Sequence, residues 1–256
     1  MVKKRLIFTL LYRNGKFNLS RNFTLQGVGD FKWLMENYDF KNIMHYIDEL
    51  VILNVDREIR TDDFVEKIKD IVKGCFIPIA CGGGIKTMKD AYSFLDAGAD
   101  KVVINSLIHE NPNEVKKIID VFGSQFVVGS IDYKSVDGIS FVYTNCGQKN
   151  TGLSLENVIK TYQDIGVGEI YLTAMQKDGT GQGYDLDIIN NLTNIQVPLI
   201  VSGGAGKPIH FKQVFDIDGV DAVSTANLFN FMSGGLIDAR AYLLDNGVNL
   251  ARWKTL

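Results

Sequence analysis

The sequence predicts one (β/α)₈ barrel, the α/β fold known as a TIM barrel, and three observations support it. The length of 256 residues suits one such barrel, or two small domains. Short apolar runs alternate with longer amphipathic stretches, which is typical of parallel strands joined by helices. The two halves of the chain also repeat a strand–glycine–helix pattern at a fixed offset. A doubly wound open sheet is the main alternative.

Eight short apolar runs are expected to form the strands. The first, Arg5–Leu11, follows a basic start that could mimic a signal peptide. We interpret it as a strand because Arg13, Asn14 and Gly15 follow at once and no small-residue cleavage site appears. The other seven runs are Glu49–Asn54, Phe76–Cys81, Lys101–Asn105, Gln125–Ile131, Glu169–Thr173, Val197–Ser202 and Ala222–Thr225.

Amphipathic stretches between these runs predict the helices. The clearest are Asp62–Val72, Met88–Ala97, Pro112–Val121, Leu155–Ile165 and Ile209–Phe215. Some open with residues that favour a helix start, such as Asn111 before Pro112. The segment Ser135–Thr151 predicts a hairpin after the fifth strand, because Val136-Asp137-Gly138 is a turn signal and SFVYT is strand-like.

The internal repeat indicates two half-barrels of four βα units each. At an offset of 120 residues, the matched pairs are Pro78 with Pro198, Gly83 with Gly203, Gly84 with Gly204 and Glu49 with Glu169. No linker or low-complexity stretch separates the halves. We therefore expect one domain over residues 1–256, with half-barrels at roughly 1–122 and 123–256.

Composition and charge argue against several classes of function. The net charge is −3 and no basic stripe is visible, so nucleic acid is not an expected partner. No run approaches the roughly 18 apolar residues of a membrane span, so a membrane is not expected either. The odd count of three cysteines, without a CxxC pair, favours a reducing cytoplasm. The histidines lack metal or hydrolase spacing, so we treat them as structural and expect no metal and no cofactor; they are His45, His109 and His210.

Two glycine clusters predict phosphate binding. Cys81–Gly84 follows the third strand, Ser202–Gly206 follows the seventh, and a helix comes after each. Glycine lets the backbone approach a ligand closely, and the free N–H groups at a helix start attract phosphate. A tight turn alone could explain one cluster, but two matching clusters favour a substrate with two phosphates. The residues expected at these sites are Gly83, Gly84, Asn105, Ser106, Gly203, Gly204, Thr225 and Asn227.

Two carboxylates are candidates for acid–base catalysis. Asp132 ends the fifth strand, and Asp178 lies in the loop after the sixth. Catalytic residues of barrel enzymes stand at this end of the strands. A helix cap or a loop-stabilising contact is the alternative role for either residue.

Motifs along nearly the whole chain resemble the cyclase subunit of imidazole glycerol phosphate synthase. They include FIPIACGGGI from Phe76, AGADKVVINS from Ala97, GEIYLTAMQKDGTGQGYD from Gly168 and VPLIVSGGAGK from Val197. The resemblance implies a barrel that docks a class-I glutaminase on its bottom face. Ammonia from the glutaminase then crosses the barrel and attacks a diphosphorylated ribulosyl substrate at the top.

The resemblance also implies roles for five residues at the bottom of the barrel. A ring of four charges that gates the entry of ammonia corresponds to Arg5, Glu49, Lys101 and Glu169, and a contact with the glutaminase corresponds to Asp100. Two positive and two negative side chains compensate one another, as buried charges must. A purely structural plug of ion pairs is the alternative for the ring.

The top of the barrel departs from the family pattern. Leu11 takes the place of the first catalytic aspartate, Leu19 that of a lysine that grips substrate, and Gln176 that of an acid. Asn54 also differs from the family, and of the usual acid–base pair only Asp132 remains. Leucine cannot transfer a proton, and losing such a group typically costs about 10²–10⁴-fold in rate.

The sequence TLLY around Leu11 resembles that of a divergent branch of the family. Members of that branch work with a glutaminase and a third, amidotransferase-like protein. Together they convert an acetamido group to an acetamidino group on bacterial surface sugars.

Three hypotheses follow. The first is a synthase subunit that uses glutaminase-derived ammonia to amidinate a phosphorylated, sugar-type precursor of a surface polysaccharide or nonulosonic acid. The second is the cyclase of histidine biosynthesis, a lyase-type enzyme, against which Leu11 argues. The third is a non-catalytic scaffold that activates and docks a glutaminase. The bottom charges fit a scaffold equally well, but a scaffold has no use for phosphate loops.

Overall fold

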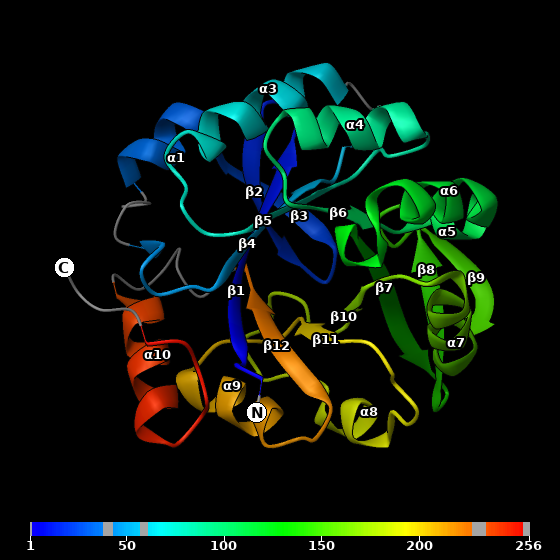
Figure 1. Ribbon diagram of the computed structural model, residues 1–256. Coiled ribbons are helices and arrows are strands. Elements are labelled where there is room, and N and C mark those ends of the chain that lie inside the picture. Colours follow the sequence, from blue (N-terminus) through cyan, green and yellow to red (C-terminus); the bar gives the residue numbers. More distant parts are fainter. Residues whose placement is uncertain (1, 38–42, 57–60, 227–233, 253–256) are drawn as a thin grey trace.

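Eight parallel strands close into a barrel in the computed structural model, which describes residues 2–37, 43–56, 61–226 and 234–252 (Figure 1). The strands are β1 (Arg5–Arg13), β4 (Glu49–Asn54), β5 (Ile79–Gly82), β6 (Lys101–Ile104), β7 (Val127–Val136), β10 (Glu169–Ala174), β11 (Leu199–Ser202) and β12 (Val220–Thr225). The sheet closes because β1 pairs with both β4 and β12, and β10 pairs with both β7 and β11. This confirms the predicted (β/α)₈ barrel; the half-barrel boundary near residue 122 stays a prediction.

Helices surround the barrel and follow its strands (Figure 1). They are α1 (Phe31–Asn37), α3 (Thr61–Val72), α4 (Met88–Asp96), α5 (Ser106–Glu110), α6 (Pro112–Phe122), α7 (Leu155–Ile165), α8 (Leu186–Asn191), α9 (Pro208–Phe215) and α10 (Gly235–Asp245). The predicted start of α6 is confirmed, because the Asn111 side chain accepts a hydrogen bond from Glu114 N and Pro112 opens the helix. Of the helices that the structure describes, none combines the length and the apolar character of a membrane span.

Two antiparallel extensions continue the sheet beyond the carboxyl ends of β1 and β7. The second consists of β8 (Ile139–Thr144) and β9 (Lys149–Ser154) and confirms the predicted hairpin. Its turn residues Asp137 and Gly138 both have positive φ, as a two-residue hairpin turn requires. The first extension, β2 (Lys16–Arg21) and β3 (Thr24–Gly29), was not predicted.

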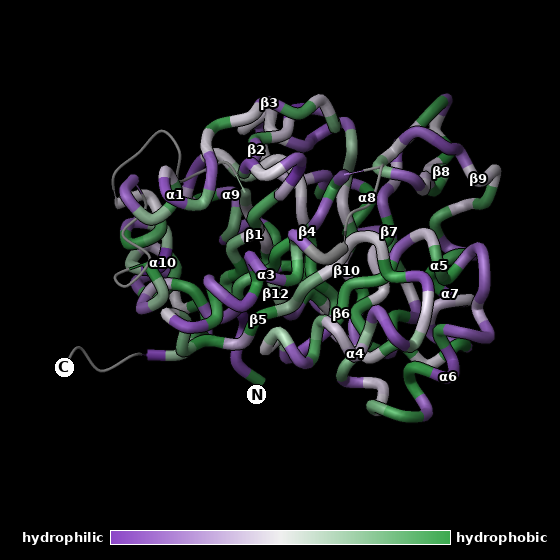
Figure 2. Tube along the Cα trace, turned by 90° about the horizontal axis from the view of Figure 1, so that it is seen from above, coloured by the Kyte–Doolittle hydropathy of each residue, from purple (hydrophilic) through white to green (hydrophobic). Residues whose placement is uncertain are grey.

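The hydrophobic core has two parts. The larger part fills the space between the strands and the helices. The smaller part lies inside the barrel and consists of Ile7, Val51, Ala80, Val103, Val128, Tyr171, Ile200 and Ala222. Figure 2 shows hydrophobic residues concentrated along the barrel strands, with hydrophilic residues toward the outside. Because alternate residues of a strand face the same side, the inward positions form layers from the bottom of the barrel to its top.

Candidate functional site

A cavity of about 450 Å³ opens at the carboxyl ends of the barrel strands. It is covered in part by the two extensions, which contribute Ser20, Phe23 and Leu25 from one side and Asn145 and Cys146 from the other. The cavity brings together six of the predicted residues, namely Gly83, Gly84, Asn105, Ser106, Asp132 and Asp178. Gly203, Gly204 and Thr225 do not line it, and Asn227 lies outside the described residues.

Asp132 lies on the cavity wall, where β7 brings it beside β6 and β10. Its Oδ2 accepts a hydrogen bond from Asn105 Nδ2 at 3.1 Å, and the Thr173 side chain provides a second one. Burial, reinforced by the nearby charge of Asp178, raises the pKa of Asp132 to about 7. A carboxyl group with such a pKa populates both protonation states at neutral pH, which suits general acid–base chemistry.

Asp178 holds the first extension over the cavity. Its Oδ2 accepts hydrogen bonds from Ser20 Oγ at 2.5 Å and from Phe23 N at 3.1 Å, and its main-chain oxygen accepts one from Asn22 N at 2.8 Å. Burial raises the pKa of Asp178, although the hydrogen bonds from Ser20 and Phe23 oppose that effect. These contacts support the loop-stabilising alternative; an acid–base role for Asp178 stays a prediction.

The wall beside β1 and β4 is apolar. Leu11 lines the cavity next to Leu53, its partner in the neighbouring strand, and Phe23 and Leu25 of the first extension lie on the same cavity. Leu19 does not line the cavity and pairs with Gln26 within the extension. The position of the missing aspartate therefore presents hydrocarbon to any ligand.

Gln176, another departure from the family pattern, also lies away from the cavity lining. Its Nε2 donates a hydrogen bond to Asp185 Oδ2 at 3.0 Å. That oxygen also accepts a hydrogen bond from Tyr133 OH at 3.3 Å. Gln176 therefore contributes to a polar contact at the start of α8 and does not face a ligand in the cavity.

The two glycine clusters differ in their surroundings. Gly83, at φ +99°, lies so close to β4 that a Cβ there would meet Asn54 O at 2.0 Å, yet it is partly exposed to the cavity. Gly204, at φ +111°, is buried, and a Cβ there would meet Gly183 O at 2.1 Å. Close packing thus explains the second cluster, whereas the first also faces a ligand site. Phosphate binding at either cluster stays a prediction.

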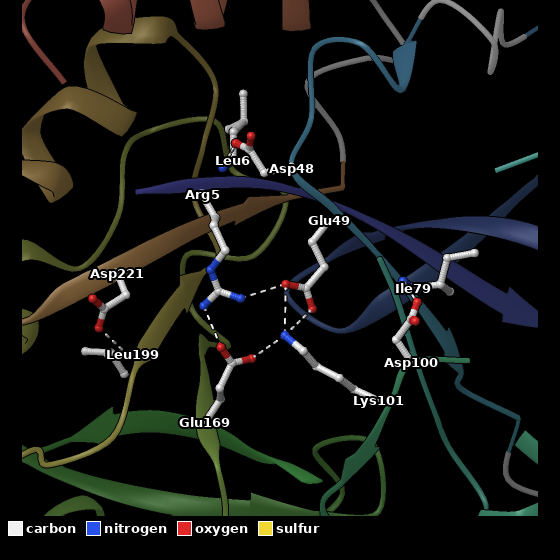
Figure 3. A network of polar contacts seen from close by, with 10 residues as sticks. All are labelled: Arg5, Leu6, Asp48, Glu49, Ile79, Asp100, Lys101, Glu169, Leu199 and Asp221. Atoms are coloured by element: carbon white, nitrogen blue, oxygen red, sulfur yellow. Dashed lines mark hydrogen bonds and ion pairs between the residues drawn. The ribbon is translucent and has the colours of Figure 1, made fainter. Parts of the chain in front are cut away.

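At the bottom of the barrel, the four predicted ring residues point toward one another (Figure 3). Arg5 lies 2.7 Å from Glu49 and 2.7 Å from Glu169, while Lys101 lies 3.1 Å from Glu49 and 2.9 Å from Glu169. Burial raises the pKa of Glu49, against the effect of Lys101 and Arg5. Each carboxylate thus contacts both cations, and the ring as a whole is neutral. Its function as a gate stays a prediction.

Asp100 has a structural contact beside the ring. Its Oδ2 accepts a hydrogen bond from Ile79 N at 2.8 Å and so ties the start of β5 to that of β6. Asp48 accepts from Leu6 N at 2.8 Å and Asp221 accepts from Leu199 N at 3.1 Å in the same manner (Figure 3). The exposed Asp100 side chain remains a predicted contact for a glutaminase.

The three histidines make contacts that fit the structural treatment given to them. His109 Nε2 lies 3.1 Å from Tyr162 OH, and His210 Nδ1 accepts a hydrogen bond from Gly206 N at 3.2 Å. The ring of His45 packs on Phe76, with the ring centroids 4.9 Å apart.

Several cavity residues had no place in the sequence analysis. Thr173 near the end of β10 and Ser130 within β7 line the cavity, and Lys86 is the cation among the described lining residues. The inward alternation of strand ends could have identified Thr173, two residues after Tyr171. No local signal points to Ser20, whose partner Asp178 is 158 residues away.

Comparisons with known proteins agree with this architecture. Residues 35–233 match the family model described as histidine biosynthesis protein. The chain is 38% identical, over its full length and 96% of the relative, to a protein of Parasynechococcus marenigrum (strain WH8102) provisionally named imidazole glycerol phosphate synthase subunit hisF2. It is 34% identical to the imidazole glycerol phosphate synthase subunit HisF of Chlorobaculum tepidum, over 98% of this chain and 99% of the relative. Identity to the subunit of the same name from Clostridium botulinum is 36%, over the same shares.

Proposed function

The chain belongs to the histidine biosynthesis protein family as a HisF-like synthase subunit, and we propose that it delivers ammonia from a class-I glutaminase to a sugar-type acceptor. The glutaminase binds the bottom face, and ammonia crosses the barrel to the top cavity. There it is used to convert an acetamido group to an acetamidino group. The acceptor is a phosphorylated precursor of a bacterial surface polysaccharide or nonulosonic acid, and a third, amidotransferase-like protein takes part.

The identity of Leu11 is the observation that carries this proposal. Cyclisation in the synthase family uses two carboxylates on opposite sides of the substrate, one as acid and one as base. Here Asp132 lines the same cavity as the apolar wall made by Leu11 and Leu53, and the nearby Asp178 is engaged by Ser20 and Phe23 of the first extension. A reaction that needs one proton-transferring group fits this cavity better than one that needs two.

The bottom ring supports the entry of ammonia. Its four ion pairs span the bottom of the barrel with a net charge of zero, so the ring holds no uncompensated charge that would favour an ion over a neutral molecule. The relatives named above are subunits of imidazole glycerol phosphate synthase, which accords with a partner on this face. In the proposal, Asp100 contacts the glutaminase beside the ring.

The part of the first glycine cluster that lines the cavity supports the proposal that the acceptor is phosphorylated. Gly83 and Gly84 offer backbone groups to the cavity, and Asn105, Ser106 and Lys86 lie on the same surface. Crystals soaked in inorganic phosphate are expected to show an anion at Gly83 and Gly84. A second anion is expected near Gly204 if the acceptor carries two phosphates. A top face without any anion at high phosphate contradicts the substrate class.

The cyclase of histidine biosynthesis is the second candidate, because relatives bearing that subunit's name are 34–37% identical over 98% of this chain. Complementation of a histidine auxotroph that lacks its own cyclase subunit separates the two. We expect no growth without histidine, whereas the Chlorobaculum tepidum subunit serves as the positive control. Leu11→Asp should recover little, because Leu19 and Asn54 also differ. Robust growth with the unchanged chain restores the cyclase assignment.

Capture of a glutaminase tests the other half of the proposal. Co-purification with a cognate class-I glutaminase is expected, and Asp100→Ala should weaken it. Asp132→Asn, at the opposite end of the barrel, should leave the capture unchanged and abolish formation of the amidino product. A non-catalytic scaffold predicts capture and full product formation with Asp132→Asn, so this variant separates the scaffold from the enzyme.

A further inference from the structure

Four hydroxyl groups meet inside the barrel and form the floor of the top cavity. Thr9 Oγ1 lies 2.9 Å from Tyr171 OH and 2.7 Å from Ser224 Oγ. Tyr171 OH lies 3.1 Å from Ser202 Oγ and 2.8 Å from Ser224 Oγ. Thr9, Tyr171 and Ser202 line the cavity, and Ser224 is fully buried beneath them. Residues from β1, β10, β11 and β12 thus converge on one point.

The cluster has more hydrogen-bond acceptors than donors. A hydroxyl group carries one proton and two lone pairs. Tyr171 OH donates its single proton toward both Ser202 Oγ and Ser224 Oγ, and the four oxygens carry twice as many lone pairs as protons, so acceptor positions remain. Burial raises the pKa of Tyr171, so the phenol stays protonated and the cluster stays uncharged. Such a site suits a small neutral molecule that is rich in N–H or O–H donors.

The cluster lies between the charged ring and Asp132. On β10, Glu169 belongs to the ring, Tyr171 to the cluster, and Thr173 donates to Asp132. These are alternate residues of one strand, so all three point into the barrel. The Tyr171 side chain, only 2% exposed, packs in the apolar layer inside the barrel with Ile7 and Ile200. A molecule that passes the ring toward Asp132 therefore meets Tyr171 first.

We propose that Thr9, Tyr171, Ser202 and Ser224 form a binding site for neutral ammonia, at which ammonia is held before it reaches the reacting group beside Asp132. This inference rests on the proposed function and adds to it a defined stopping point inside the barrel. Ammonia offers three N–H donors, which match the free acceptor positions of the cluster. Ammonium is disfavoured, because an uncharged, buried site does not compensate the loss of its hydration.

A titration of tyrosine resonances tests this site on the full chain alone. Protein labelled with ¹³C at the tyrosine ζ carbon is titrated with ammonium chloride above the pKa of ammonium, where much of the ammonia is neutral. The Tyr171 resonance, assigned by its disappearance in Tyr171→Phe, should shift and saturate. Tetramethylammonium chloride at the same concentration should produce no shift, and neither should ammonium chloride at neutral pH.

Two variants determine whether the cluster binds the ammonia. Thr9→Val keeps the shape of the side chain but removes one hydroxyl, and should weaken the apparent affinity roughly three- to tenfold. Tyr162→Phe is the matched control: it removes another buried hydroxyl, which bonds to Ser130 O and lies outside the cluster, and the affinity should not change.

The outcomes separate this site from the proposed function. A Tyr171 resonance without a saturable shift, or a shift of equal affinity in Thr9→Val, overturns the site even if a glutaminase is captured. A saturable shift that Thr9→Val weakens supports the site, even if no glutaminase binds and the proposed function fails.

Discussion

The two ends of the barrel handle charge in opposite ways. At the bottom, two cations and two carboxylates form a closed ring in which every charge has two partners. At the top, the described cavity lining holds four carboxylates, those of Asp56, Glu110, Asp132 and Asp178, against the single ammonium of Lys86. The pKa of Asp132 is raised to about 7 there. At the bottom every charge of the ring is paired with charges of opposite sign. At the top the carboxyl group of Asp132 can both bind and release a proton near neutral pH.

The largest loss of stability is expected for a variant of the charged ring at the bottom of the barrel. Lys101→Met removes a cation that contacts both Glu49 and Glu169, and Glu49 is almost fully buried. Leaving a buried charge with fewer partners should cost about 3–5 kcal/mol in the free energy of unfolding by urea. Lys69→Met breaks an exposed pair with Glu66 and should cost far less, because solvent screens that pair. Equal losses for the two variants would mean that the ring does not act as a buried network.

At the top of the barrel, removing a charge should stabilise the protein. Asp132 has a pKa of about 7 when folded and about 4 when unfolded. Between these values the folded protein holds a proton that the unfolded chain has released, so stability falls as pH rises from about 4 to about 7. Asp132→Asn does not titrate. Its free energy of unfolding should exceed that of the unchanged protein by about 1–3 kcal/mol at pH 8, and the difference should disappear near pH 4. A constant difference across this range would contradict the raised pKa.

Asp178 holds the first extension, β2–β3, over the top cavity, and its contacts can be tested by substitution. Asp178→Ala removes the acceptor for Ser20 Oγ and Phe23 N, so the free energy of unfolding should fall by about 1–2 kcal/mol. Faster amide exchange at Phe23 should accompany the loss. Asp178→Asn keeps one carbonyl acceptor and should show a smaller change in both measurements. Unchanged amide exchange at Phe23 in the alanine variant would show that other contacts hold the first extension in place.

The smallest effect is expected at an exposed contact at the bottom of the barrel. Asp100→Ala removes the acceptor for Ile79 N, but water can reach this position, so the loss should be about 0.5–1 kcal/mol. Asp221→Ala removes the equivalent acceptor for Leu199 N and should cost a similar amount. A much larger loss for Asp100 would indicate that its side chain fixes the neighbouring ring as well.

The repeating elements of the fold could be predicted because their signals are local. All eight barrel strands appear where apolar, β-branched runs predict them, and α7 has the predicted bounds. The predicted strand from Phe76 begins instead at Ile79, because Phe76 is exposed and Pro78 has no N–H to donate. The first extension was not predicted, although Asn14-Gly15, with both residues at positive φ, is a strong hairpin signal.

The site was predicted less completely because its contacts span the chain. Asp132 could be found from its place at a strand end. The contact of Ser20 with Asp178 and the meeting of Thr9 with Tyr171 bridge more than 150 residues, and no spacing rule indicates them. Gly204 illustrates the opposite error: its motif favours a ligand, but its surroundings show close packing on Gly183.

The two extensions also affect how copies of the protein meet one another. A closed barrel has no free edge, but β2–β3 and β8–β9 give this sheet two end strands, β3 and β9. A long, regular end strand would invite pairing with another chain and aggregation. Here β3 contains Gly27 and Gly29 beside a register shift, and β9 contains Gly152 at φ +73° beside another. These irregularities interrupt the row of hydrogen-bonding groups, so the rim offers a poor template for a strand from a second molecule.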